Sequence, residues 1–312
     1  MAWLVILVGL VVLLAGAEAL VRGSSWLAEA MGIRPLIVGL TVVAIGTSAP
    51  ELVVSVLAAN EGQTGLVVGN IFGSNTANIA LILGTTAALR SIDTSETKLR
   101  FETTWLVVAS LLTFVPFLDG GYSQQLGLAM LAMITLFIAW LVRREQRARP
   151  SKADEPQSNR TFAAAAAHVA LTGMGGAGLY FGGGWLVDGA VTIAKELGMS
   201  PPVIGATVIA IGTSLPELAA SIVAARRGHP EMAVGNVIGS NIFNILLVLG
   251  VTSTISPIPV SWAEHGTRTL VPMVLTGFVA FLLLRGSRVT KPVGFILLAT
   301  YAWYIIWEVL QT

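Results

Sequence analysis

One segment of this chain occurs twice. Residues 39–84 and 205–250 align without a gap over 46 positions, and 26 of these positions are identical. Each copy places one glutamate, Glu51 or Glu217, inside a long apolar stretch, and the two glutamates stand 166 residues apart. The same interval relates Asn78 to Asn244. A duplication of this kind predicts two equivalent halves that build one polar site between them.

The composition places this duplication in a membrane. Hydrophobic residues make up 54% of the 312 residues and charged residues only 11%, against about a quarter in ordinary soluble domains. Apolar runs of roughly 20 residues, enough to cross the hydrocarbon core, recur along the whole chain. They are continuous, whereas the strands of a transmembrane barrel alternate apolar and polar residues. We therefore predict an all-α membrane protein surrounded by lipid bilayer.

Two further features of composition narrow the possibilities. The chain has no cysteine, which excludes disulfides and thiolate metal sites. Its net charge of +1 gives no reason to expect a nucleic-acid partner. The N-terminal apolar run lacks a basic leader and exceeds a typical signal-peptide core, so we interpret it as a retained first span.

The apolar runs predict ten transmembrane helices. Their expected ranges are 2–28, 35–60, 65–89, 102–118, 124–142, 162–194, 201–226, 231–256, 267–284 and 290–309. A charged segment with two prolines, residues 143–160, separates the fifth run from the sixth. We interpret it as a flexible linker between two five-span halves, residues 1–142 and 161–312.

The two halves are predicted to be inverted relative to each other. Five is an odd number, so the second half enters the membrane from the side opposite to the first. If the linker is cytoplasmic, 16 of the 18 Lys and Arg residues fall in cytoplasmic connections, and only Lys195 and Arg268 fall outside them. Cytoplasmic loops carry such an excess of basic residues. We therefore expect a cytoplasmic linker, with both termini outside.

The two repeated glutamates are expected to bind a cation. An ionised carboxylate inside a bilayer costs several kcal/mol unless it is paired or solvated, and neither glutamate has a Lys or Arg within its own span. Two facing carboxylates would also repel each other, so that one would bind a proton. A divalent cation between Glu51 and Glu217 would remove that repulsion.

Further oxygen ligands surround both glutamates in the sequence. The hydroxyl pairs Thr47–Ser48 and Thr213–Ser214 precede the glutamates by three and four residues, a spacing that predicts one shared helix face. The prolines Pro50 and Pro216 cannot donate a backbone hydrogen bond, which frees carbonyl groups one turn earlier. Broken transporter helices use such carbonyls to hold cations. Oxygen ligands without nitrogen or sulfur favour sodium, calcium or magnesium.

A second repeated motif supplies Ser and Asn side chains. It reads GNIFGSNTAN in the first copy and GNVIGSNIFN in the second. Ser74 and Asn78 are four residues apart, as are Ser240 and Asn244, so each pair is expected to share a helix face. The glycines four apart within the motif predict close helix packing.

Each of these signals has a simpler structural interpretation. Proline in a membrane helix is often only a kink, Ser and Thr often bond their own backbone, and Asn can join two helices. Packing alone does not explain why all of them recur at a fixed interval around a buried acid. Glu18 has glycine at its equivalent position, and the three histidines are not repeated. We therefore leave these residues out of the site.

The motifs GTSAPEL with GNIFGSN, and GTSLPEL with GNVIGSN, resemble the two alpha repeats of the cation/calcium antiporter superfamily. Residues 39–84 correspond to the alpha-1 repeat and residues 205–250 to alpha-2. Within that superfamily the chain looks like a prokaryotic sodium/calcium exchanger. The resemblance implies an antiporter of the plasma membrane that exchanges sodium for calcium by alternating access, with the first and sixth spans sliding, and with no cofactor.

The resemblance also implies the ligands of the transported Ca²⁺ and Na⁺ ions. Glu51 and Glu217 would bind both ions in turn. Some relatives carry Asp where this chain has Asn244. The full set of candidate ligands is Glu51, Glu217, Thr47, Thr213, Ser48, Ser214, the carbonyls of Ala44 and Ala210, Ser74, Ser240, Asn78 and Asn244.

Three alternative functions stay open at the level of sequence. Proton/calcium relatives resemble GNAxE where this chain has GTSxPE, and the extra hydroxyls favour sodium over protons. An intramembrane hydrolase with Ser48 or Ser214 as nucleophile would need a His or Lys base, and the repeats offer none at that depth. A channel would need a filter, and nothing here resembles one lined by carbonyls alone. We therefore expect a transporter and not an enzyme.

Overall fold

The computed structural model describes residues 1–89, 91–92, 99–148, 161–199, 208, 210–285 and 288–311. These residues are almost wholly helical, as the apolar runs predict. The first half contains α1 (Ala2–Met31), α2 (Pro35–Val38), the π-helical segment η1 (Gly39–Val43), α3 (Ala44–Thr47), α4 (Ala49–Asn60), α5 (Thr64–Thr76), the π-helical segment η2 (Ala77–Leu83), α6 (Gly84–Leu89), α7 (Arg100–Leu112), α8 (Pro116–Asp119) and α9 (Gln124–Ala148).

The second half repeats this pattern. It contains α10 (Phe162–Glu196), α12 (Ala210–Thr213), α13 (Leu215–Arg226), α14 (Pro230–Phe243), the π-helical segment η4 (Asn244–Val248), α15 (Leu249–Ile255), α16 (Trp262–Leu284) and α17 (Lys291–Gln311). The short strands β1 (Gly121–Tyr122) and β2 (Ile258–Pro259) pair antiparallel, with Tyr122 opposite Ile258. Ile92, which precedes Ile258 by 166 residues, forms an isolated bridge with Val289. Equivalent positions of the two halves thus each pair with a loop of the other half.

Most of the predicted membrane spans are present as long helices. Among the described residues, eight helices are long and apolar enough to cross a membrane, and a ninth span results if the bent pair Pro35–Thr47 and Ala49–Asn60 counts as one. The remaining predicted span, 201–226, includes residues 201–207 and 209, which lie outside the described residues. The protein is therefore an all-helical, multi-span membrane protein, and the count of ten stays a prediction.

The fifth span continues beyond the predicted start of the linker. Helix α9 runs to Ala148, whereas we expected the linker to begin at residue 143. Two ion pairs fix this extension to the rest of the fold. Arg144 pairs with Glu102 of α7, and Glu145 pairs with Arg34 just before α2. Residues 149–160 of the predicted linker lie outside the described residues.

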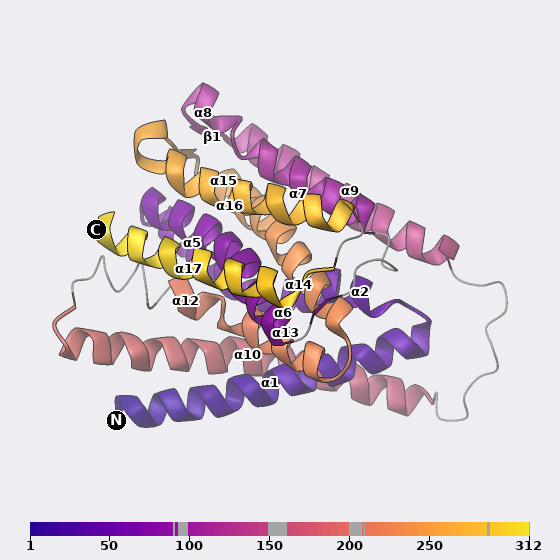
Figure 1. Cartoon of the computed structure of the whole chain (residues 1–312). Coiled ribbons are helices and arrows are strands. Elements are labelled where there is room, and N and C mark those ends of the chain that lie inside the picture. Colours follow the sequence, from indigo (N-terminus) through magenta and orange to yellow (C-terminus); the bar gives the residue numbers. More distant parts are fainter. Residues whose placement is uncertain are drawn as a thin grey trace.

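Helices α1 and α10 run side by side along one face of the molecule (Figure 1). Their contact is made by glycines seven residues apart, at positions 9, 16 and 23 of α1 and 175, 182 and 189 of α10. These two sets are also related by the 166-residue interval. A Cβ atom added at any of these six positions would lie within 3.0 Å of a backbone atom of the opposite helix. The missing side chains therefore let the two backbones touch directly.

Helices α5 and α14 form the centre of the fold. Of the spans that contain them, Thr64–Leu89 and Pro230–Ile255, 83% and 89% of the apolar window is buried, against 33% for α1. Gly235 and Gly239 of α14 lie directly against the backbone of Leu36 and Leu40 in the first half. The predicted close packing of the glycine motif is confirmed for this copy. The repeated motifs therefore lie where the two halves meet.

Candidate cation-binding site

A helix break precedes each repeated glutamate. Helix α3 ends at Thr47, Ser48 leaves helical geometry with φ −82° and ψ 5°, and α4 starts at Ala49. The second half does the same at Ser214, with φ −87° and ψ 1° between α12 and α13. Pro50 and Pro216 occupy the first turn of the new helices, where a missing N–H costs little. Glu51 and Glu217 follow in that same first turn.

Both glutamates are buried and act on each other. The exposed fraction is 0% for Glu51 and 1% for Glu217. Glu217 is the charged group that acts electrostatically on Glu51, so the two carboxyl groups lie in one site. Neither oxygen of Glu51 has a hydrogen-bond partner in the described residues, nor does Oε2 of Glu217. Two uncompensated acids in one dry site are stable only if something positive, a cation or a proton, joins them.

Three of the four repeated hydroxyl groups contact the glutamate of the opposite half. Ser48 Oγ donates a hydrogen bond of 3.2 Å to Glu217 Oε1. The Thr47 side chain also interacts with Glu217, and the Thr213 side chain interacts with Glu51 without meeting strict hydrogen-bond geometry. Ser48 also caps the start of α4, because its carbonyl accepts a hydrogen bond from the Leu52 N–H at 3.3 Å. The helix face that the sequence predicts Ser48 to share with Glu51 stays a prediction.

Two asparagines of the glycine motif hold the glutamate helices in place, and sequence reasoning missed them. Asn70 Nδ2 donates to the carbonyl of Glu51 at 3.1 Å and to Ser55 Oγ at 2.9 Å. Asn236 makes the equivalent bonds to Glu217 and Ser221, at 3.4 Å and 3.0 Å. All of these residues recur at the 166-residue interval, which was the available signal.

We expect Asn236→Ala to destabilise the protein by about 1 to 3 kcal/mol, the usual cost of leaving buried polar partners unpaired. Thermal denaturation in detergent, with and without calcium, measures this effect. Asn241→Ala is the matched control, because the Asn241 side chain donates only within its own helix, to Val237 at 2.7 Å. Equal losses of stability in the two variants would contradict the proposal that Asn236 holds α13 in place.

The Ser and Asn residues of the second motif meet across the halves as well. Asn244 Nδ2 donates to Ser74 Oγ at 3.0 Å and to Asn75 Oδ1 at 3.1 Å. Asn78 has no partner for either polar side-chain atom in the described residues. Ser240 Oγ contacts Asn236 Oδ1 at 3.5 Å. Asn78 lies within η2 and Asn244 begins η4, and such π-helical turns often occur at functional sites.

Backbone carbonyls complete the polar surroundings. The Ala44 carbonyl accepts from the Ser48 N–H at 3.0 Å and from the Thr47 hydroxyl at 3.4 Å. Ala210, its repeat equivalent, begins α12 at the same place in the second half. A carbonyl oxygen has two lone pairs, so one that accepts a hydrogen bond can still bind a cation.

The unpartnered oxygens fit a hard cation. Among the candidate ligands, six buried oxygen atoms lack a hydrogen-bond partner within the described residues: both of Glu51, Oε2 of Glu217, Oγ of Ser214, and Oδ1 of Asn78 and Asn244. Calcium takes six to eight oxygen ligands, and carboxylates and amide carbonyls are among those it prefers. The described residues contain no cluster of three or more His, Cys, Asp or Glu side chains. Two carboxylates are therefore the charged part of the site, and they match the charge of one divalent cation.

The fold and the site together define a membrane transporter whose two halves share one buried, acidic, oxygen-lined candidate site. The profile of the family described as "Sodium/calcium exchanger protein" matches residues 1–143 and 167–310. The chain therefore belongs to the sodium/calcium exchanger family. It is a cation/calcium antiporter, and the resemblance found in the alpha repeats is confirmed.

Individual relatives agree with this assignment. The chain is 39% identical to a proposed antiporter, CaxA, of Alkalimonas amylolytica, and 29% identical to the sodium/calcium exchanger MaX1 of Methanosarcina acetivorans; 97% of each chain is covered in both comparisons. Its structure is similar to that of the sodium-calcium exchanger NCX_Mj soaked with Na⁺ and Sr²⁺, with a TM-score of 0.86 and 30% identity. That similarity covers 98% of this chain and 97% of the other. These relatives are transporters rather than enzymes, which removes the hydrolase alternative.

Proposed function

We propose that this protein exchanges sodium for calcium across the prokaryotic plasma membrane by alternating access. The observation that carries the proposal is the pair of buried glutamates, one from each half, in a site with six unpartnered oxygen atoms. One Ca²⁺ would balance both carboxylates. Several Na⁺ ions would replace it by using the same acids together with the flanking hydroxyls and carbonyls. Because both ions need the same ligands, they cannot bind together, and this competition couples the two fluxes.

We assign the ion ligands on the same grounds. The acids bind either ion, and the neutral oxygens complete the neighbouring sodium positions. The proposed ligands are Glu51, Glu217, Thr47, Thr213, Ser48, Ser214, the carbonyls of Ala44 and Ala210, Ser74, Ser240, Asn78 and Asn244. Hydrogen bonds between the halves support this set, since Ser48 bonds Glu217 and Asn244 bonds Ser74.

Sliding of α1 and α10 would expose the site to each side in turn. The continuous glycine contact between these two helices supports this, because a surface without protruding side chains offers little steric resistance to sliding. The paired bridges at equivalent positions of the two halves support the inverted repeat that such a mechanism requires.

The proposed orientation places the linker in the cytoplasm and both termini outside. Figure 1 supports it, since the two chain ends lie at one end of the bundle, whereas the end of α9 and the start of α10 lie at the other. The excess of Lys and Arg in the connections on the linker side sets the direction.

A proton/calcium antiporter is the alternative coupling. The burial of two neighbouring carboxylates without a basic partner among the described residues favours proton coupling. One of the two would hold a proton whenever no metal ion is bound. The hydroxyls Thr47, Ser48, Thr213 and Ser214 favour sodium, because protons need no such ligands.

Uptake of radioactive calcium into proteoliposomes tests the proposal. We expect an outward-directed sodium gradient to drive calcium uptake, and potassium or proton gradients of equal size to drive none. Uptake driven by a pH gradient in sodium-free medium would instead establish the proton-coupled alternative. Single-channel currents in the same liposomes would contradict both.

A further inference from the structure

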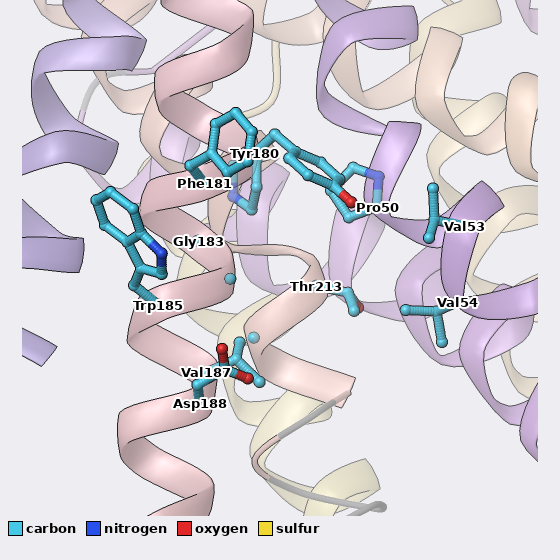
Figure 2. Close-up of a pocket in the computed structure, with 13 residues that line it drawn as sticks. Pro50, Val53, Val54, Tyr180, Phe181, Gly183, Trp185, Val187, Asp188 and Thr213 are labelled. Atoms are coloured by element: carbon cyan, nitrogen blue, oxygen red, sulfur yellow. The ribbon is translucent and has the colours of Figure 1, made fainter. Parts of the chain in front are cut away.

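A cleft of about 320 Å³ lies next to the segments that carry the acid pair. One wall is α10, from Tyr180 to Asp188, and the other is made by Pro50, Val53 and Val54 of α4 and by Gly212, Thr213 and Pro216 (Figure 2). The two prolines directly precede Glu51 and Glu217, and Thr213 interacts with Glu51. The inner wall of the cleft therefore lies directly beside the proposed cation site, although Glu51 and Glu217 do not line it.

Among the described residues that line this cleft, Asp188 contributes the one carboxylate. The other lining side chains are apolar or uncharged, and several aromatic ones, such as Phe181 and Trp185, are partly exposed. In Figure 2 the Asp188 carboxylate points toward the cleft, beside Val187 and below Thr213. Asp188 is itself exposed, and the apolar walls of low dielectric constant beside it focus its potential into the opening.

The duplication does not account for this acid. The position equivalent to Asp188 in the first half is Arg22, of opposite charge. The two residues lie toward opposite ends of the α1–α10 pair, because Gly189 contacts Ala2 and Ile6 whereas Gly23 contacts His168 and Thr172. The repeat therefore does not require an acid at this position, and this chain places a negative charge at the end that carries the termini.

We propose that Asp188 concentrates cations at the mouth of this cleft and thereby lowers the KM for transported ions from the side of the termini. This inference depends on the proposed cation site. In this role Asp188 attracts ions to the cleft and does not itself bind an ion in the site. The attraction raises the ion concentration at the mouth of the cleft above that in bulk solution by some factor. Since electrostatic energy scales with charge, this factor for Ca²⁺ equals the square of the factor for Na⁺.

The test is a pair of charge changes, Asp188→Asn and Asp188→Arg, the second being the residue of the other half. At an ionic strength of about 0.1 M and an ion–carboxylate distance of about 10 Å, we expect Asp188→Asn to raise the KM about two-fold for Na⁺ and about four-fold for Ca²⁺. Asp188→Arg should raise them about four-fold and sixteen-fold. Both effects should shrink toward none at about 1 M ionic strength, while kcat stays unchanged.

The assay uses proteoliposomes sorted by an N-terminal tag, so that uptake is measured from the side of the termini, with choline chloride setting ionic strength. Glu61→Gln is the matched control, because it removes one exposed acid outside the cleft. An unchanged KM, equal factors for Na⁺ and Ca²⁺, or a salt-independent change would overturn the inference. Loss of transport in Glu51→Gln together with an unchanged KM in Asp188→Asn would leave the proposed function intact and remove only the role of Asp188.

Discussion

We expect Glu51→Gln and Glu217→Gln each to reduce sodium-driven calcium uptake by more than about 100-fold. The reason is the loss of one full charge in a buried site, where a charge–charge contact is worth on the order of 4 kcal/mol or more. Neither glutamate has a basic partner among the described residues, and both oxygens of Glu51 lack any hydrogen-bond partner there. Uptake of radioactive calcium under an imposed sodium gradient measures the effect.

Thermal stability distinguishes a variant that no longer binds calcium from one that no longer folds. A ligand that binds only the folded state raises its stability, so calcium should raise the thermal midpoint of the unmodified protein. In both Gln variants that calcium-dependent increase should disappear, while the midpoint without calcium stays equal or rises, because a buried repulsion is removed. Glu61→Gln, an exposed change, should leave uptake unaltered. Full transport in both Gln variants would refute the assigned site.

The second large effect concerns an ion pair outside the cation site. We expect Arg144→Leu to destabilise the protein by about 3 to 5 kcal/mol, because it leaves a buried carboxylate without its cation. Glu102 is fully buried and accepts a hydrogen bond of 2.7 Å from Arg144, whose guanidinium also lies over the rings of Phe101 and Trp140. Thermal denaturation in detergent measures the loss.

The double variant Glu102→Gln with Arg144→Leu is the control. It removes both charges, so we expect it to recover most of the stability lost in Arg144→Leu. The second half offers an internal comparison, because Arg268, the repeat equivalent of Glu102, pairs with Glu308 of α17. The same contact between neighbouring spans is thus made with the charges exchanged. Equal instability of the single and double variants would show that packing, and not the charge pair, holds α7 against α9.

The repeated motifs were sufficient to predict the class of protein. Apolar run length predicted most of the helices, because a span must satisfy its own backbone in lipid. The 166-residue interval marked Glu51, Glu217 and their neighbouring oxygens as one set, because few pressures other than a shared site would preserve polar residues in equivalent apolar segments. The same interval would have marked Asn70 and Asn236, had every repeated polar side chain been given equal weight.

Three features depended on contacts that no local pattern records. Ser48 bonds the glutamate of the opposite half, because helix packing brings the start of α13 against the break between α3 and α4. Helix α9 continues to Ala148, because distant partners, Glu102 and Arg34, hold residues that look like a polar linker. Asp188 lies at a cleft only because α10 faces α4 and α13 across it.

By itself, the sequence determined that this chain is a helical membrane protein with a doubled, oxygen-rich acidic motif, because lipid permits few spanning structures and makes every buried charge costly. The tertiary structure alone decided which hydroxyl bonds which glutamate, where the helices end and which acid lines the cleft. The physical reason is that these outcomes depend on atoms more than a hundred residues apart in the chain, brought together by helix packing.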